Sequence, residues 1–161
     1  MLFMGQEFLE WGAWSDEREL NWSNARQFAG IRMLYRDMIR LRRNWYNSTR
    51  GLSGQNVNVH HVNNSDKVIA YHRWHNGGPR DDVVVVANFA DRTYRSYHVG
   101  FPRAGTWRVR LNSDFHEYSS VFGDYPSFDT QARPDSAADG MPCGGDIGIG
   151  RYTFIILSQD A

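Results

Sequence analysis

A continuous apolar run lies at residues 83–87, where four valines are followed by Ala87, and Phe89 comes shortly after. β-Branched side chains are stiff at χ1 and favour strands, and a run without polar alternation is typical of a strand buried on both faces. We therefore expect residues 82–90 to form the central strand of a β domain.

Turn signals and alternating side chains predict further strands around this one. Residues 57–62 and 67–74 flank Asn-Asn-Ser-Asp at 63–66, a sequence that closes hairpins. Three more strands are expected at residues 94–101, 106–111 and 152–157, and the region 114–145, rich in Asp, Ser, Gly and Pro, is expected to be a long loop with short strands. Strands at this spacing predict a mainly β fold, an antiparallel sandwich with Greek-key connections.

The first third of the chain has a different pattern. Apolar residues from Asn24 to Trp45 fall on one arc of a helical wheel, after Ser23 or Asn24 as the N-cap, and Arg32, Arg36, Arg40 and Arg43 form a neighbouring stripe. Arg42 falls inside the apolar arc, so it needs a buried partner or must extend its guanidinium to water. Residues 1–4 are apolar and predict a short buried strand that has no neighbour in sequence to pair with. The chain is thus expected to divide near residue 50, into parts 1–50 and 51–161.

Composition narrows the classes of protein. With 161 residues, 41% of them hydrophobic, the chain can hold one ordinary domain or a small one with part of another, and no stretch approaches the roughly 20 apolar residues of a membrane span. Net charge is zero, so the arginine stripe is read as a solvated helix face and no nucleic-acid partner is expected. A single cysteine, Cys143, and the absence of a secretory signal favour the cytoplasm.

No catalytic or metal-binding pattern emerges from the residues alone. In the predicted hairpin, partner numbers sum to about 129, which sends His60 and His61 to opposite faces and leaves His72 opposite neither. Cys143 lies in a loop-like sequence, and Asp81 and Asp82 are adjacent carboxylates rather than an acid–base pair across a cleft. We expect no catalytic residue, no metal and no cofactor.

Aromatic residues are the remaining candidates for binding. Exposed tryptophans can stack on the apolar face of a sugar ring, while core packing is the alternative for each of them. The three tryptophans in the mixed-charge stretch 10–22, Trp11, Trp14 and Trp22, are the better candidates for a glycan-facing surface, and Trp74 and Trp107 for the core.

Two parts of the chain resemble one enzyme family. Met-Leu-Phe-Met-Gly-Gln-Glu-Phe at 1–8, Glu-Leu-Asn-Trp at 19–22 and the arginine-rich helix resemble the end of the catalytic barrel of 1,4-α-glucan branching enzymes, in the α-amylase superfamily. Asn21 stands where that family commonly has Asp. The β part, with residues 67–74 and 83–89, is similar to the all-β C-terminal domain of the same enzymes.

The resemblance implies a function and a place for the candidate residues. Residues 1–4 would be the last strand of a (β/α)₈ barrel and the helix its outer helix, and the family's catalytic carboxylates, which lie on earlier strands, have no counterpart here. Gln6, Glu7 and Trp11 would lie at the end of the barrel that carries the active site, as supporting or substrate-facing residues together with Trp14 and Trp22.

The expected function is therefore a C-terminal accessory domain, inactive alone, of a branching-enzyme-like protein acting on the α-1,4-glucans of glycogen or starch. A carbohydrate-binding module and the C-terminal domain of an α-amylase-type hydrolase are the alternatives. The expected partner is an α-glucan, with no nucleic acid and no membrane, and the unburied helix face is expected to make the isolated chain self-associate.

Overall fold

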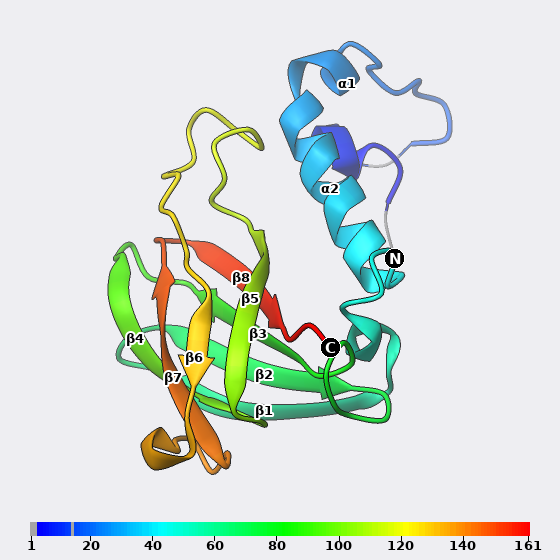
Figure 1. Cartoon of the computed structure of the whole chain (residues 1–161). Coiled ribbons are helices and arrows are strands. Elements are labelled where there is room, and N and C mark those ends of the chain that lie inside the picture. Colours follow the sequence, from blue (N-terminus) through cyan, green and yellow to red (C-terminus); the bar gives the residue numbers. More distant parts are fainter. Residues whose placement is uncertain (1–2, 14) are drawn as a thin grey trace.

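A computed structural model describes residues 3–13 and 15–161, and it shows an N-terminal helical part lying across one face of a two-sheet β-sandwich (Figure 1). The helical part comprises the 3₁₀ turn η1 (Gln6–Phe8), α1 (Asn24–Gln27), α2 (Ala29–Arg42) and η2 (Arg50–Ser53). The strands, with one more 3₁₀ turn, are β1 (Asn56–Asn63), β2 (Val68–Trp74), β3 (Val83–Asn88), β4 (Tyr94–Phe101), β5 (Gly105–Asn112), β6 (Thr130–Ala132), η3 (Pro134–Ser136), β7 (Cys143–Ile149) and β8 (Thr153–Ser158). The fold is mainly β, as predicted.

The strands form a six-stranded sheet in the order β1-β2-β3-β8-β5-β6 and a two-stranded sheet of β4 and β7, with antiparallel pairing throughout the described residues. The chain leaves the large sheet after β3, returns with β5, and inserts its last strand, β8, between them. Returns of this kind over a long stretch of chain are typical of Greek-key sandwiches.

Strand β3 has the central place and the double burial that its valines predict. It pairs with β2 on one side and β8 on the other, and Val83–Val86 are all buried. Because side chains alternate along a strand, Val84 and Val86 join the core between the sheets, with Trp107 and Phe101, while the other two valines face outward. The core of the sandwich is therefore built around this strand.

Helix α2 covers the outer side of β3. Leu34, Met38 and Leu41 pack onto the cluster that contains Val83 and Val85. Arg42 is exposed, so it extends its guanidinium to water, which was one of its two expected solutions.

The helix also differs from its prediction in two respects. It is not continuous from Asn24 to Trp45, because Phe28 (φ −109°, ψ 39°) separates α1 from α2, and α2 ends at Arg42. Ser23 occupies the N-cap position of α1, without a capping bond from its own side chain. Near this break, the backbone of Glu117 and Tyr118 lies so close to Gly30 that a Cβ there would overlap it.

The predicted strand at residues 1–4 is not present in its described part. Met1 and Leu2 lie outside the described residues, and Phe3 and Met4 are exposed and non-strand. Gly5, with φ 86°, turns the chain directly into η1. The division of the chain near residue 50 stays a prediction.

The interpretation of Cys143 as a loop residue is also wrong, because it begins β7 and is buried. The glycines next to it hid this strand in the sequence. A Cβ at Gly145 would lie 2.7 Å from Thr130 Cγ2, and one at Gly144 would overlap the carbonyl of Ser136, so these glycines allow close packing against β6 and η3.

Within residues 3–13 and 15–161, no helix is both long enough and apolar enough to cross a membrane.

Candidate functional site

The N-terminal loop carries the residues that the sequence places near a substrate. η1 follows Gly5 and buries Phe8, while Gln6 is exposed and accepts a hydrogen bond from the Phe3 N–H at 2.9 Å. Glu7, the next residue, is half-buried and turns toward α2. Gln6 and Glu7 are adjacent in sequence but lie in different environments, Gln6 in solvent and Glu7 against α2.

The rest of the loop is closed by polar contacts around Asn21. The Asn21 N–H donates to the Glu10 carboxylate at 3.0 Å, and the Asn21 side-chain oxygen accepts from the N–H and hydroxyl of Ser23 at 3.2 and 2.6 Å. An aspartate would also supply the side-chain oxygen of this turn, but not the hydrogen bond that the Asn21 amide nitrogen donates to Asn24 Oδ1 at 3.2 Å.

Two of the three loop tryptophans are described, and both are exposed. Trp11 is 78% exposed and Trp22 67%, although one side of Trp22 rests on Phe8 with ring centroids 5.5 Å apart. Trp14 lies outside the described residues. The loop therefore offers aromatic surface to solvent, which is what stacking on a sugar requires.

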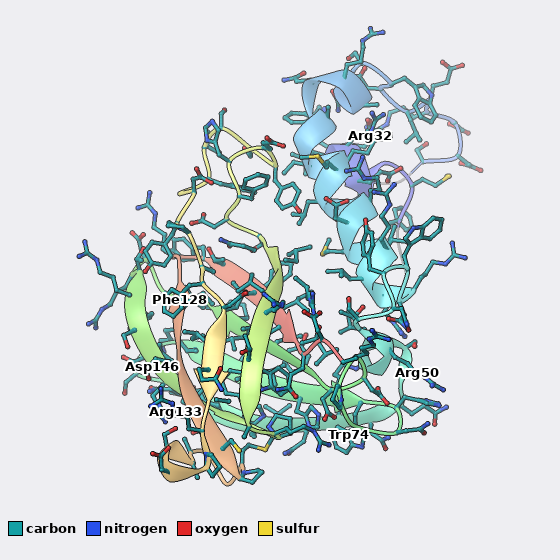
Figure 2. All side chains as sticks on the ribbon, viewed as in Figure 1. Arg32, Arg50, Trp74, Phe128, Arg133 and Asp146 are labelled. Atoms are coloured by element: carbon teal, nitrogen blue, oxygen red, sulfur yellow. The ribbon has the colours of Figure 1, made fainter. Side chains whose placement is uncertain are left out.

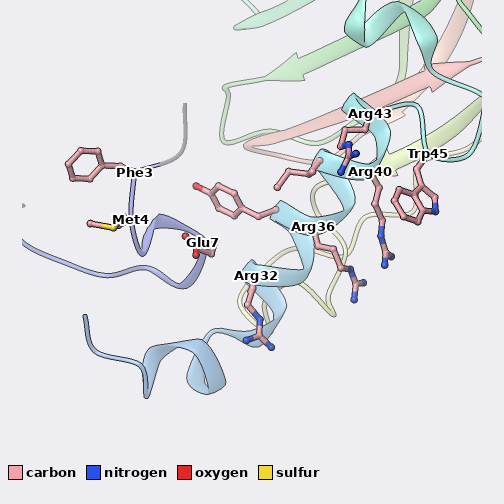
Figure 3. Close-up of a pocket in the computed structure, with 10 residues that line it drawn as sticks. Phe3, Met4, Glu7, Arg32, Arg36, Arg40, Arg43 and Trp45 are labelled. Atoms are coloured by element: carbon pink, nitrogen blue, oxygen red, sulfur yellow. The ribbon is translucent and has the colours of Figure 1, made fainter. Parts of the chain in front are cut away.

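A groove of about 640 Å³ runs along the side of α2 that faces this loop (Figure 3). Its apolar lining comes from Tyr35, Ile39 and Trp45 together with Phe3 and Met4. Its polar lining comprises Glu7 and the arginines predicted as one stripe, Arg32, Arg36, Arg40 and Arg43. Of the substrate-facing candidates that the structure describes, Glu7 alone lines this groove.

A second groove, of about 610 Å³, lies on the other side of α2 over the outer face of the large sheet. It is almost wholly apolar and includes Ile69, Tyr71, Phe89, Tyr152 and Phe154. The sequence pattern marked Tyr35, Ile39 and Trp45 as part of the helix's apolar arc, but nothing in it marked Phe89 or Tyr152 as exposed. Helix α2 is thus flanked by apolar surface on both sides.

Two histidines of β1, His60 and His61, connect the large sheet to the small one. A bulge between Val59 and His61 shifts the register, so His60 and His61 both turn toward β4, and the prediction that they face opposite sides is wrong. The His60 ring lies 3.1 Å from the Gly100 carbonyl, and His61 contacts Asp139 at 2.8 Å and the Tyr97 hydroxyl at 3.0 Å. Burial raises the pKa of Tyr97 to about 12, so this hydroxyl stays protonated as a hydrogen-bond donor.

Within the described ranges, no group of three or more histidine, cysteine or acidic side chains is arranged to hold a metal ion.

The adjacent carboxylates serve a turn rather than a reaction. Asp81 accepts hydrogen bonds from three successive backbone N–H groups, those of residues 75–77, and Asp82 accepts from the Gly78 N–H and from His72. Burial works to raise the pKa of Asp82, but the bonds from His72 and Gly78 outweigh it and hold the pKa below its usual range. Asp82 is therefore charged, and both carboxylates are buried turn anchors.

Trp107 and Trp74 are the two tryptophans predicted for the core. Trp107 is fully buried between the sheets, whereas Trp74, at the end of β2 (Figure 2), is half-buried and stacked on His72 at a centroid distance of 4.4 Å. Neither offers the free aromatic face that Trp11 and Trp22 present.

Comparison with known families agrees with this architecture. Residues 59–159 match the family model described as the α-amylase C-terminal all-β domain. The chain belongs to this family. The match begins within β1 and ends just after β8, so it covers nearly the whole β-sandwich.

Individual relatives include proteins named 1,4-alpha-glucan branching enzyme GlgB. The Pseudomonas syringae protein (strain B728a) is 32% identical over 143 residues, which are 83% of this chain, and the Burkholderia thailandensis protein is 36% identical over 122 residues, 73% of this chain. The chain spans only 18% and 14% of their lengths. The chain is therefore a distant homologue of the C-terminal region of these enzymes.

A solved structure shows the same fold. The α-amylase from H. orenii superposes with a TM-score of 0.50 and 18% identity over 90% of this chain and 24% of that one.

Proposed function

We propose that this chain is the non-catalytic accessory domain of a 1,4-α-glucan branching enzyme, and that it supports the enzyme's catalytic body through helix α2. The Pseudomonas syringae and Burkholderia thailandensis branching enzymes are 32% and 36% identical to the chain, and the chain corresponds to 18% and 14% of their lengths.

One observation carries the proposal: the apolar arc of α2 is wider than the β-sandwich covers. Leu34, Met38 and Leu41 pack on the β-sandwich, whereas Tyr35 and Ile39, farther round the same arc, line the open groove with Trp45. A surface helix normally turns its apolar arc toward a core and its polar residues toward water. The uncovered part of this arc is suited to contact a second body, which would be the catalytic part of the branching enzyme.

A chimeric enzyme tests this support role. The whole chain replaces the region it matches in the Pseudomonas syringae branching enzyme, and branching is followed as the fall in iodine absorbance of amylose. We expect the chimera to branch amylose and the chain alone to leave it unchanged. Ile39→Asp should lower the chimera's activity at least tenfold, because it puts a charge into the contact with the second body.

Val62→Asp is the matched control, since Val62 is an exposed aliphatic residue on β1, away from the groove. An Ile39→Asp chimera as active and as heat-stable as the Val62→Asp chimera would refute the support role, and so would an inactive parent chimera. Release of reducing ends in place of branching by the natural protein would favour an α-amylase-type hydrolase.

We also propose that the N-terminal loop touches the glucan, through Trp11 and Trp22 with Gln6 and Glu7 beside them. Its support is the exposure of the two indole rings. In native gels containing glycogen, the chain should be retarded, and Trp11→Ala and Trp22→Ala should each restore most of its mobility. Trp45→Ala, which removes another exposed tryptophan, should leave the retardation intact. Equal mobility with and without glycogen would rule out this contact.

A further inference from the structure

Strand β1 is a long edge strand of the large sheet, and its protection is limited to a bulge between Val59 and His61. It ends the strand order, and residues 55–63 contain no Asp, Glu, Lys or Arg. Its outward-facing valines Val57, Val59 and Val62 are 57%, 56% and 63% exposed. The opposite edge strand, β6, has only three residues. Edge strands normally carry charges or are short, because their unpaired backbone groups otherwise pair with another chain.

The two halves of β1 differ in how far they are tied down. The half after the bulge is tied to β4, since His60 contacts the Gly100 carbonyl and both His61 and Asn63 contact the Tyr97 hydroxyl. In the half before it, the side chains of residues 56–59 are all exposed. In the part of the chain that the structure describes, no backbone–backbone hydrogen bond from outside the sheet reaches this half. Its contacts beyond the ladder involve side chains: the His60 ring lies 3.5 Å from the Asn58 carbonyl, and the Asn58 amide lies 3.9 Å from Met141 Sδ. The more open part of the edge is therefore Asn56 to Val59.

We propose that residues 56–59 pair antiparallel with the same residues of a second copy of this chain, about a two-fold axis at Asn58. Antiparallel pairing about that residue sets Val57 opposite Val59 of the second copy on the outer face, and the two Asn58 residues opposite each other. Cross-strand pairs of β-branched residues stabilise such a ladder, and a two-fold axis uses the same short segment twice. The large sheet then continues across the dimer.

Charge selects a second copy at this edge. Because residues 55–63 are uncharged, two copies meet there without repulsion, and a charged partner would gain no ion pair. The groove beside α2 is a poorer surface for self-association, since it carries four arginines and two copies would bring them together. This inference concerns the isolated chain and does not rest on the proposed function.

Sedimentation velocity over a range of chain concentrations tests the pairing. We expect a concentration-dependent dimer and a dissociation constant at least ten times higher for Val57→Lys/Val59→Lys. Val62→Lys is the matched control, because Val62 has the same chemistry and exposure but lies beyond the bulge, and it should leave the constant unchanged. A monomer at all concentrations would overturn the proposal, as would a dimer that Ile39→Lys abolishes and Val57→Lys/Val59→Lys preserves.

A covalent test does not depend on the lysine variants folding normally. Directly opposed residues of an antiparallel pair have Cα atoms about 4.5–5.5 Å apart, which is within the range of a disulfide. Asn58→Cys should therefore form a disulfide-linked dimer under mild oxidation, whereas Val62→Cys should stay monomeric; the natural Cys143 is buried. Equal cross-linking of the two variants would overturn the two-fold pairing.

Discussion

The carboxylate of Asp81 organises the turn that leads into β3. It accepts hydrogen bonds from the N–H groups of His75, Asn76 and Gly77 at 2.9, 2.6 and 2.9 Å, and it is buried. These three N–H groups lose contact with water on folding, and the hydrogen bonds to the carboxylate compensate for that loss. One side chain thus fixes the chain just before its central strand.

Replacing this carboxylate should be costly. Asp81→Ala is expected to lower the free energy of unfolding by about 2–4 kcal/mol, because partly buried N–H groups are left without an acceptor. Asp91→Ala is the matched control: its carboxylate pairs with Arg151 at 3.3 Å on the surface, and such pairs contribute below about 1 kcal/mol. Urea unfolding at neutral pH measures both variants, and equal losses would show that Asp81 is not a turn anchor.

Residue roles of this kind could not be predicted from the sequence. The pair Asp81 and Asp82 is visible there, but its partners come from turn geometry. His60 and His61 were assigned to opposite faces because the alternation of a strand was applied without the bulge, which nothing in the local sequence marks. The exposure of Trp11 and Trp22 likewise depends on what the loop packs against.

At the scale of elements, periodicity and turn chemistry were reliable wherever the sheet itself decides burial. β1, β2, β3, β4, β5 and β8 all lie where the alternating or continuous apolar runs predict them, within a few residues. In these strands the side-chain pattern and the hydrogen-bonded ladder require the same backbone.

The misplaced elements are those where tertiary contacts decide. β7 is rich in glycine and looked like a loop, yet its glycines let β6 and η3 approach closely. Helix α2 separates from α1 at Phe28, next to the close contact at Gly30, and Gly5 turns the chain after Met4 into η1. The two grooves that flank α2 could not be predicted, because they arise from how the helix lies on the sheet.

At the scale of the whole molecule, the small sheet is joined to the β1 edge of the large one through histidines. The His60 ring reaches the Gly100 carbonyl of β4, and beside it His61 reaches Tyr97 and Asp139, whose carboxylate also accepts the Gly100 N–H at 2.8 Å. Burial lowers the pKa of His60, while its carbonyl contacts and the charge of Asp139 oppose part of that effect and His72 adds to it. The joint between the sheets is thus built on a histidine that favours its neutral form.

Acid should therefore loosen this joint before it disturbs the carboxylates. An unfolded histidine has a pKa of about 6.5, so the stability that neutral His60 contributes is complete above that pH and is lost as the pH falls through its lower folded pKa. The lowered pKa of Asp82 acts only below about pH 4, and His98, whose pKa is raised by Asp146, acts in the opposite sense from an exposed pair that contributes little.

We expect the free energy of unfolding, from urea titrations between pH 7 and pH 5, to fall with pH, and the fall to be clearly smaller in His60→Gln. His116→Gln, which replaces an exposed loop histidine, is the control and should keep the wild-type slope. Identical slopes for all three proteins would mean that His60 does not sense pH at the joint.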